Sequence, residues 1–173
     1  MGQEWAASTP FQYFTDHAPK LGRLVTEGRR SEFSGFAAFR DPAAREQIPD
    51  PQDDATFLRS KLCWDEIDSD HHAATLRLYR EFLRLRRESQ ALRDRSRGNL
   101  RVLAPSDGVI QLVFGKAGTE QCLVLVDLIG GDGRPKLDRG HEWHLLLSSN
   151  EKRFGGEESE PFAQPEVRVF RSG

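Results

Sequence analysis

Residues 1–17 read MGQEWAASTPFQYFTDH, and no other stretch of the chain is as informative. It contains four large aromatic residues, Trp5, Phe11, Tyr13 and Phe14. Three ionisable residues accompany them, namely Glu4, Asp16 and His17. The stretch follows neither the 3.6-residue period of a helix nor the two-residue period of a strand. Aromatic rings beside polar acceptors are typical of the rim of a ligand cleft. We therefore expect residues 1–17 to form a cleft wall that belongs to a larger architecture.

Composition excludes several classes of protein. The chain has 173 residues, 37% of them hydrophobic and 30% charged, with a net charge of -2. That charge offers no electrostatic case for binding nucleic acid or an anionic membrane, so neither is expected as a partner. No apolar run approaches the roughly 18 residues of a membrane span. Cys63 and Cys122 lie far apart without metal-ligand spacing, which predicts a cytoplasmic protein with no metal site. The sequence carries no phosphate-cradling loop and no dinucleotide fingerprint, so no cofactor is expected.

The first 70 residues are rich in loops. A helix is expected over residues 21–36, and a shorter one over residues 55–62 that Asp53 or Asp54 caps. A loop-rich segment of this length is unusual in a compact domain unless it serves a site or packs on a partner.

Residues 71–88 give the strongest helical pattern, because apolar side chains recur there at spacings of three and four. Arginines fill much of the other face and alternate with Glu81 and Glu88, which indicates a solvated face more than a phosphate site. Five strands follow, at residues 100–103, 109–114, 122–129, 143–147 and 166–171. Short strands with glycine-rich turns predict an antiparallel β-sandwich.

Several motifs together resemble one enzyme family. Residues 1–17, 21–33 and 48–62 are similar to segments of the malto-oligosyltrehalose trehalohydrolases, which belong to the α-amylase superfamily of glycoside hydrolases. The most specific match is IPDPQD followed by TF and SKL within residues 48–62, because other amylase relatives do not usually carry it. Gln3 and Cys63 depart from the acidic residues that are common in the family at those places.

The resemblance implies an α+β architecture: residues 1–92 as the loop-rich helical end of a (β/α)8 barrel, and residues 93–173 as an all-β antiparallel sandwich. Met1 would then be an internal methionine of a longer enzyme. The family's catalytic carboxylates lie on earlier barrel strands, and no position here matches them, so no catalytic residue is assigned and the isolated chain is expected to be inactive. The parent enzyme would release trehalose from maltooligosyl trehalose by cleaving the adjacent α-1,4-glucosidic bond, as a step of trehalose biosynthesis. The residues expected to contact the sugar are Glu4, Trp5, Phe14, Asp16 and His17.

Two other readings stay open. The chain could be the tail of another α-amylase-family enzyme, such as a glucan branching enzyme, which should lack the match over residues 48–62. It could also be a stand-alone β-sandwich module that binds a glucan or a protein. On the first reading and on the trehalohydrolase reading, the expected partners are an α-glucan and the missing barrel portion.

Overall fold

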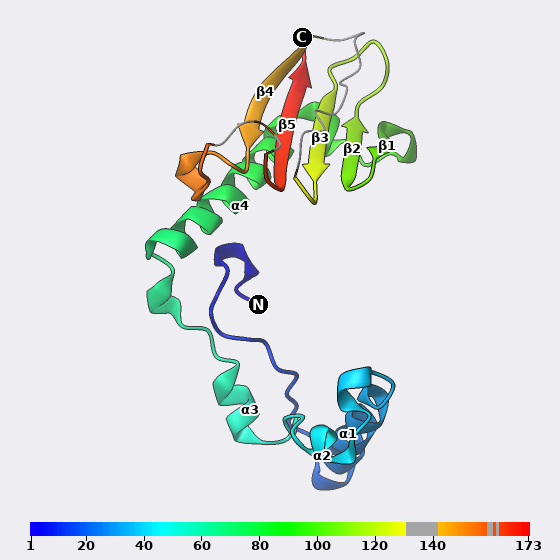
Figure 1. Cartoon of the computed structure of the whole chain (residues 1–173), viewed down its shortest axis with the longest axis vertical. Coiled ribbons are helices and arrows are strands. Elements are labelled where there is room, and N and C mark those ends of the chain that lie inside the picture. Colours follow the sequence, from blue (N-terminus) through cyan, green and yellow to red (C-terminus); the bar gives the residue numbers. More distant parts are fainter. Residues whose placement is uncertain (131–141, 159–160, 162) are drawn as a thin grey trace. The chain divides into compact units, whose positions relative to one another are not determined.

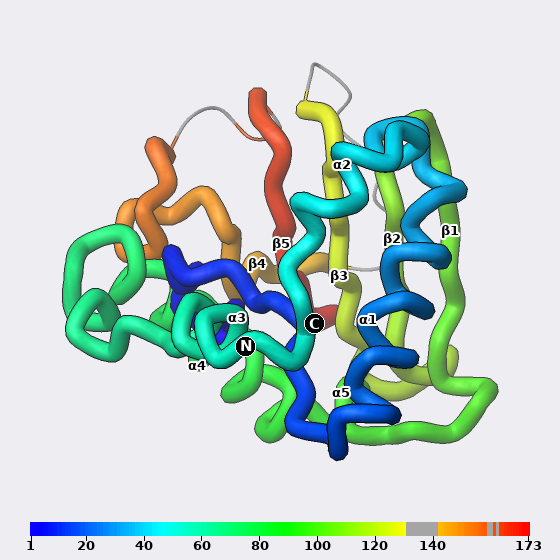
Figure 2. The backbone as a smooth tube through the Cα atoms, turned by 90° about the horizontal axis from the view of Figure 1, so that it is seen from below, coloured from blue at the N-terminus to red at the C-terminus, as the bar shows by residue number. Residues whose placement is uncertain are grey.

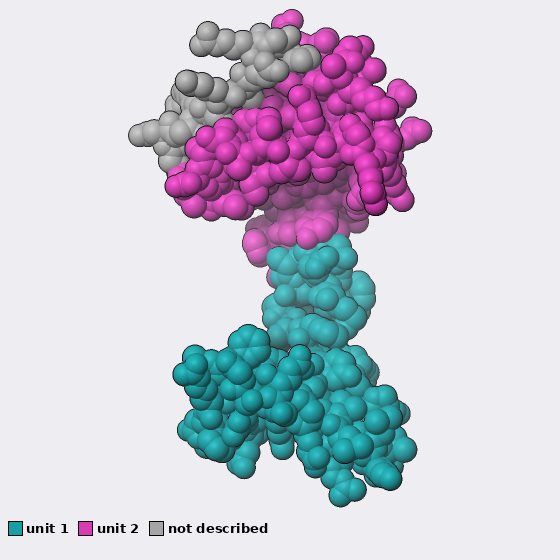
Figure 3. Space-filling model, turned by 90° about the vertical axis from the view of Figure 1, so that its right-hand side faces the viewer, with its two compact units in different colours: residues 1–67 teal, residues 68–173 magenta. Residues whose placement is uncertain are grey.

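The computed structural model of the chain describes residues 1–130, 142–158, 161 and 163–173. These residues divide into two compact units, unit 1 over Met1–Ile67 and unit 2 over Asp68–Gly173 (Figure 3). The division falls ahead of the long helix, whereas the boundary expected from the sequence lies between residues 92 and 93. The reason is that the long helix packs on the strands that follow it. The assignment of residues 1–92 to the end of a barrel stays a prediction.

Unit 1 consists of short helices joined by loops, as its many prolines and glycines suggest. Helix α1 begins at Pro19, where a proline is favoured because its missing N–H would be unpaired anyway, and ends at Phe33. The elements of the unit are the 3-10 turns η1 (Gln3–Trp5), η2 (Ala37–Phe39) and η3 (Trp64–Glu66) and the helices α1 (Pro19–Phe33), α2 (Pro42–Glu46) and α3 (Asp54–Arg59).

Unit 2 joins helices to an antiparallel sheet (Figure 1). Its elements are α4 (Asp70–Glu88), α5 (Gln90–Arg93), η4 (Arg97–Asn99), β1 (Leu100–Ser106), β2 (Val109–Phe114), β3 (Cys122–Asp127), β4 (Trp143–Ser148), η5 (Lys152–Phe154) and β5 (Glu166–Ser172). The strand order is β1-β2-β3-β5-β4, and every neighbouring pair is antiparallel. Figure 2 shows the same neighbours from below. The most continuous apolar run, β3, is the central strand of the five.

The two faces of the sheet bury different clusters. Cys122 of β3 and Val169 of β5 pack with Leu85 of α4 and Ala91 of α5, and α4 crosses behind the sheet in Figure 1. On the opposite face, Leu125 has no exposed surface, and it packs in a cluster with Val109, Val113, Leu123 and Phe170. Each such side chain contributes about 1.5–3 kcal/mol when fully buried. The sheet is thus the centre of unit 2.

The predicted β-sandwich is not confirmed. In the described residues all five strands belong to one sheet, and helices cover the face that carries Cys122 and Val169. Alternating apolar residues show that both faces of a strand are covered, but a helix can cover a face as well as a second sheet can. The coarser expectation, an antiparallel sheet together with helices, is correct.

The outer side of α4 is solvated. Arg84 forms ion pairs with Glu81 and Glu88, which fits the interpretation of the arginine run as a surface face. Leu83 on the same helix remains about half exposed. Among the residues that the structure describes, no helix has both the length and the apolar character needed to cross a membrane.

Candidate functional site

The five residues predicted to contact sugar separate into two places within unit 1. Trp5 exposes only 6% of its surface, and its ring lies 5.1 Å from that of Trp64, measured between centroids. Ser8 fastens this region, because its backbone N–H and its hydroxyl both donate to the carboxylate of Glu66. Glu4 is exposed beside Trp5. The exposed ring at this place is therefore Trp64, at 64%, which is not among the five residues predicted from the sequence.

Phe14 and Asp16 line a cavity of about 360 Å³, called here the Phe14 cavity. Phe57 of α3 forms its aromatic wall with Phe14, edge to face at 5.1 Å between centroids. The full lining is Phe14, Thr15, Asp16, Pro51, Gln52, Asp53, Asp54 and Phe57. The structure thus brings together two of the five predicted residues, and it adds carboxylates and a ring from a segment 35 or more residues away in the chain.

Gln52 holds the chain in place at this cavity. Its amide oxygen accepts hydrogen bonds from the Thr15 hydroxyl and from the backbone N–H of His17, at 2.5 and 3.2 Å. Its amide nitrogen donates to the backbone oxygen of His17 at 2.9 Å. The residue between Thr15 and His17 is Asp16, so Gln52 holds the neighbours on both sides of this carboxylate, Thr15 by its hydroxyl and His17 by its backbone. The His17 side chain is exposed next to the cavity and is not part of its lining.

Asp50 anchors the same loop to α1. Its carboxylate accepts from the Gln52 backbone N–H at 2.9 Å and from the Thr26 hydroxyl at 2.7 Å. These two hydrogen bonds, in that order, lower the pKa of Asp50, and the charge of Arg30 acts in the same direction. Since hydrogen bonds to the ionised form favour it, the loop is held most firmly when Asp50 is a carboxylate.

Helix α3 begins directly after this loop, and a loop residue caps it. The Asp53 carboxylate accepts from the Ala55 N–H at 2.8 Å, which confirms Asp53 as the cap. Thr56, fully buried, donates through its hydroxyl to the Asp50 backbone oxygen, and the Ser60 hydroxyl accepts from the Gln12 N–H. Residues 50–60, which include α3, are therefore tied by hydrogen bonds to α1 and to the N-terminal stretch, and we call them the polar clamp.

The sequence match over residues 48–62 marks this segment, but no functional role was predicted for it. Phe57 and Gln52 look like ordinary helix and loop residues until the chain folds back on residues 12–17. A signal was available: a cluster of turn formers and acids that does not follow any helix or strand period, as in residues 1–17.

The chemistry of the Phe14 cavity suits a neutral polyhydroxylated ligand. Aromatic rings pack on the apolar faces of such a molecule, and the carboxylates of Asp16, Asp53 and Asp54 can accept hydrogen bonds from its hydroxyl groups. In the part of the chain that the structure describes, no three His, Cys, Asp or Glu side chains are placed to hold a metal ion.

Comparison with known proteins gives strong matches. The chain is 59% identical over 133 residues to a malto-oligosyltrehalose trehalohydrolase of Deinococcus radiodurans, and those residues are 77% of this chain. In sequence, this chain matches part of the malto-oligosyltrehalose trehalohydrolases. A member from Brevibacterium helvolum is 41% identical over 152 residues, or 87% of this chain. No family model matches the chain.

The chain corresponds to only part of each trehalohydrolase. It spans 21% of the Deinococcus protein and 24% of the Brevibacterium protein. A 133-residue stretch of a 173-residue chain necessarily includes residues 41–133, so the match to the Deinococcus trehalohydrolase contains the whole polar clamp.

A solved structure carries the same fold as this chain. It is a crystal structure from Salmonella typhimurium described as an alpha amylase, with a TM-score of 0.70 and 27% sequence identity. The match covers 100% of this chain and 27% of that one. The α-amylase relationship expected from the sequence is thereby supported by structure as well.

Proposed function

We propose that this chain is part of an enzyme that releases trehalose from maltooligosyl trehalose by hydrolysing the adjacent α-1,4-glucosidic bond, and that the Phe14 cavity contacts the glucan. The observation that carries the proposal is the 59% identity to a trehalohydrolase across a region that includes the polar clamp behind this cavity. Trehalose biosynthesis would then be the pathway that the parent enzyme serves.

The chain's part in the reaction is to bind and orient. Phe14 and Phe57 offer ring faces and edges to a glucosyl ring, while Asp16 accepts hydrogen bonds from its hydroxyl groups. Holding the sugar in a fixed orientation raises the rate because the entropy cost of bringing the reacting atoms together is met on binding. The catalytic carboxylates of a retaining glycosidase would come from the rest of the parent enzyme.

The other predicted contacts take supporting roles in this proposal. Trp5 lies under Trp64, so Trp64 presents the exposed ring of the pair to a sugar. Glu4 and His17 are exposed at the two ends of the stretch and are available to accept or donate at the margin of the cleft.

The proposed partners are the α-glucan and the missing barrel portion. Exposed apolar side chains of α1, such as Leu21 and Leu24, are suited to packing against that barrel. We also place the parent enzyme in the cytoplasm, because Cys63 and Cys122 are both free thiols, as is usual in a reducing compartment.

A chimeric enzyme tests the proposal. The matching segment of the Deinococcus trehalohydrolase would be replaced by this chain, and trehalose release from maltotriosyl trehalose would be measured. We expect the chimera to be active and the isolated chain to be inactive. Asp16→Asn and Phe57→Ala should each lower kcat/KM by about tenfold or more, since each removes a contact to the sugar.

Leu58→Ala is the matched control. Leu58 neighbours Phe57 on α3, is 59% exposed and lies outside the cavity lining, so its truncation should leave kcat/KM unchanged. A folded chimera that releases maltooligosaccharides but no trehalose would favour another α-amylase-family activity. Equal losses for Phe57→Ala and Leu58→Ala would show that the effect comes from α3 and not from sugar contact.

A further inference from the structure

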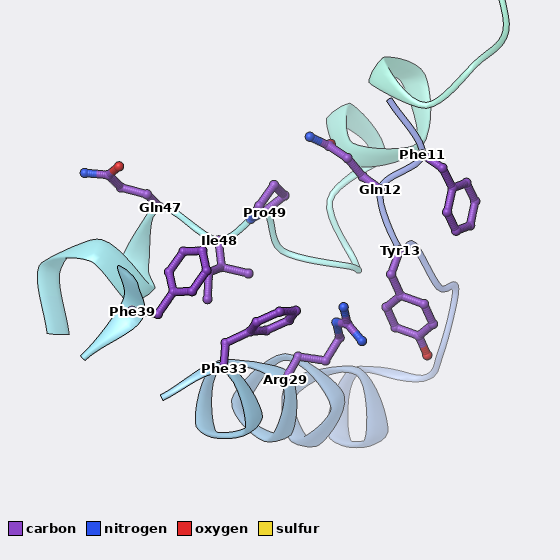
Figure 4. Close-up of a pocket in the computed structure, with 9 residues that line it drawn as sticks. All are labelled: Phe11, Gln12, Tyr13, Arg29, Phe33, Phe39, Gln47, Ile48 and Pro49. Carbon is purple, nitrogen blue, oxygen red and sulfur yellow. The ribbon is translucent and has the colours of Figure 1, made fainter. Parts of the chain in front are cut away.

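Unit 1 contains a second cavity, of about 400 Å³, between α1 and two loop segments (Figure 4). We call it the aromatic cavity, because four rings line it: Phe11, Tyr13, Phe33 and Phe39. It shares no lining residue with the Phe14 cavity. Its volume lies within the range of sites for small molecules, about 300–1,000 Å³.

The rings of the aromatic cavity are incompletely covered. Phe11 exposes 57% of its surface and Tyr13 exposes 42%. Phe33 is held edge to face against Phe39, with 5.6 Å between ring centroids. A ring that is fixed on one side and open on the other is a platform for an apolar ligand face.

Arg29 supplies polar groups in the middle of this platform. Its guanidinium carbon lies 4.4 Å from the centroid of the Tyr13 ring and 5.1 Å from that of Phe33. Figure 4 shows the group rising from α1 between these two rings. Within the described residues no carboxylate or carbonyl accepts a hydrogen bond from it, so stacking alone orients it and its N–H donors stay available.

The wall also holds an acceptor. The amide oxygen of Gln12 is buried, and no described residue donates a hydrogen bond to it. Leaving a buried acceptor unpaired is unfavourable, and a hydroxyl group from a ligand would relieve the penalty after a small side-chain rotation. The cavity thus offers donors, an acceptor and flat apolar surfaces together.

This combination discriminates between ligand classes. A phosphate or carboxylate could accept from Arg29, but it brings no donor for the Gln12 oxygen and no apolar face for the four rings. A pyranose brings a C–H face for the rings and hydroxyl groups that both donate and accept. We propose that the aromatic cavity binds a glucosyl unit of an α-glucan, as a carbohydrate contact separate from the Phe14 cavity. The choice of an α-glucan rests on the function proposed above.

The test titrates the full 173-residue chain with maltotetraose and follows backbone amide signals by NMR. Saturable shifts should appear at residues 11–13, 29–39 and 47–49. Binding should be the same at about 50 and about 500 mM NaCl, because no ion pair forms. Arg29→Lys keeps the charge but loses the stacked fork, and it should weaken binding by about tenfold or more. Tyr13→Ala should have a similar effect.

Asp16→Asn is the comparison variant, and it separates this inference from the proposed function. It should abolish shifts around Phe14 and leave those at Arg29 intact. The inference is overturned if maltotetraose shifts only the Phe14 cavity, or if Arg29→Lys with a dispersed, folded spectrum binds as well as the wild type. It is equally overturned if pyrophosphate, in a salt-sensitive manner, is what binds at Arg29. If Asp16→Asn abolishes binding and the variants at Arg29 and Tyr13 do not, the proposed function stands and the inference about the aromatic cavity fails.

Discussion

Replacing Gly22 by alanine tests the central role of Gln52 in unit 1. Gly22 lies in α1, and the backbone there passes directly under the Gln52 side chain. A Cβ atom at position 22 would lie 2.5 Å from the Gln52 amide nitrogen and 2.7 Å from its Cγ. Both distances are well inside van der Waals contact, so Gln52 must move when the methyl group is added.

The magnitude follows from two opposing effects. Moving Gln52 disrupts its three hydrogen bonds to Thr15 and His17, each worth about 0.5–1.5 kcal/mol. Alanine in a helix interior is favoured over glycine by about 0.8–1 kcal/mol. The loss exceeds the gain, and we expect Gly22→Ala to destabilise unit 1 by about 1–3 kcal/mol.

Gly28→Ala is the matched control. Gly28 lies in the same helix, and no atom stands within 4 Å of the position its Cβ would take. This substitution should stabilise unit 1 by about 0.5–1 kcal/mol through helix propensity alone. Urea unfolding followed by circular dichroism and by tryptophan fluorescence, to which Trp5 and Trp64 of unit 1 contribute, measures both variants.

A double-mutant cycle isolates the contact between position 22 and Gln52. In a Gln52→Ala background the three atoms nearest to the new methyl group are absent, so Gly22→Ala should become stabilising, as Gly28→Ala is. If Gly22→Ala stabilises the otherwise unaltered chain as much as Gly28→Ala does, Gln52 does not hold residues 15–17 and the account of the Phe14 cavity is wrong.

Three further predictions concern single groups. Hydrogen bonds lower the pKa of Asp50 in the folded chain, so its contribution to stability is full above the unfolded pKa of about 4 and is lost as the pH falls through the folded value. Asp50→Asn should therefore reduce the dependence of the free energy of unfolding on pH between about pH 5 and pH 2. Burial raises the pKa of the Cys122 thiol to about 12, so at pH 8 a thiol reagent should modify Cys63, which is exposed, and reach Cys122 only after unfolding; rapid modification of both thiols in the native chain would contradict this. Gly156→Ala would place its Cβ 2.2 Å from a backbone oxygen of the neighbouring turn and should destabilise unit 2 by about 1–3 kcal/mol in thermal unfolding, whereas Gly98→Ala, with no atom within 4 Å of the new Cβ, should have little effect.

The elements of unit 2 were predictable because their patterns are local. The helix expected over residues 71–88 follows from the spacing of its apolar residues and is found at Asp70–Glu88. The strand expected over residues 122–129 follows from a run of apolar residues and is found at Cys122–Asp127. Spacing could not show that the helix covers the sheet in place of a second sheet. Both arrangements bury the same apolar faces, so only contacts between distant residues, such as Leu85 with Val169, distinguish them.

In unit 1 the sequence by itself indicated the resemblance to the trehalohydrolases, most specifically over residues 48–62, but not which aromatic residues a ligand can reach. Trp5 and Phe14 stand in the same stretch and look equivalent as letters. Trp64 packs on Trp5 and leaves it 6% exposed, while Phe14 meets Phe57 at the edge of a cavity. Only the tertiary structure decides this, because burial depends on what folds back over a side chain, and hydrogen bonds such as those of Gln52 join residues that lie 35 or more positions apart.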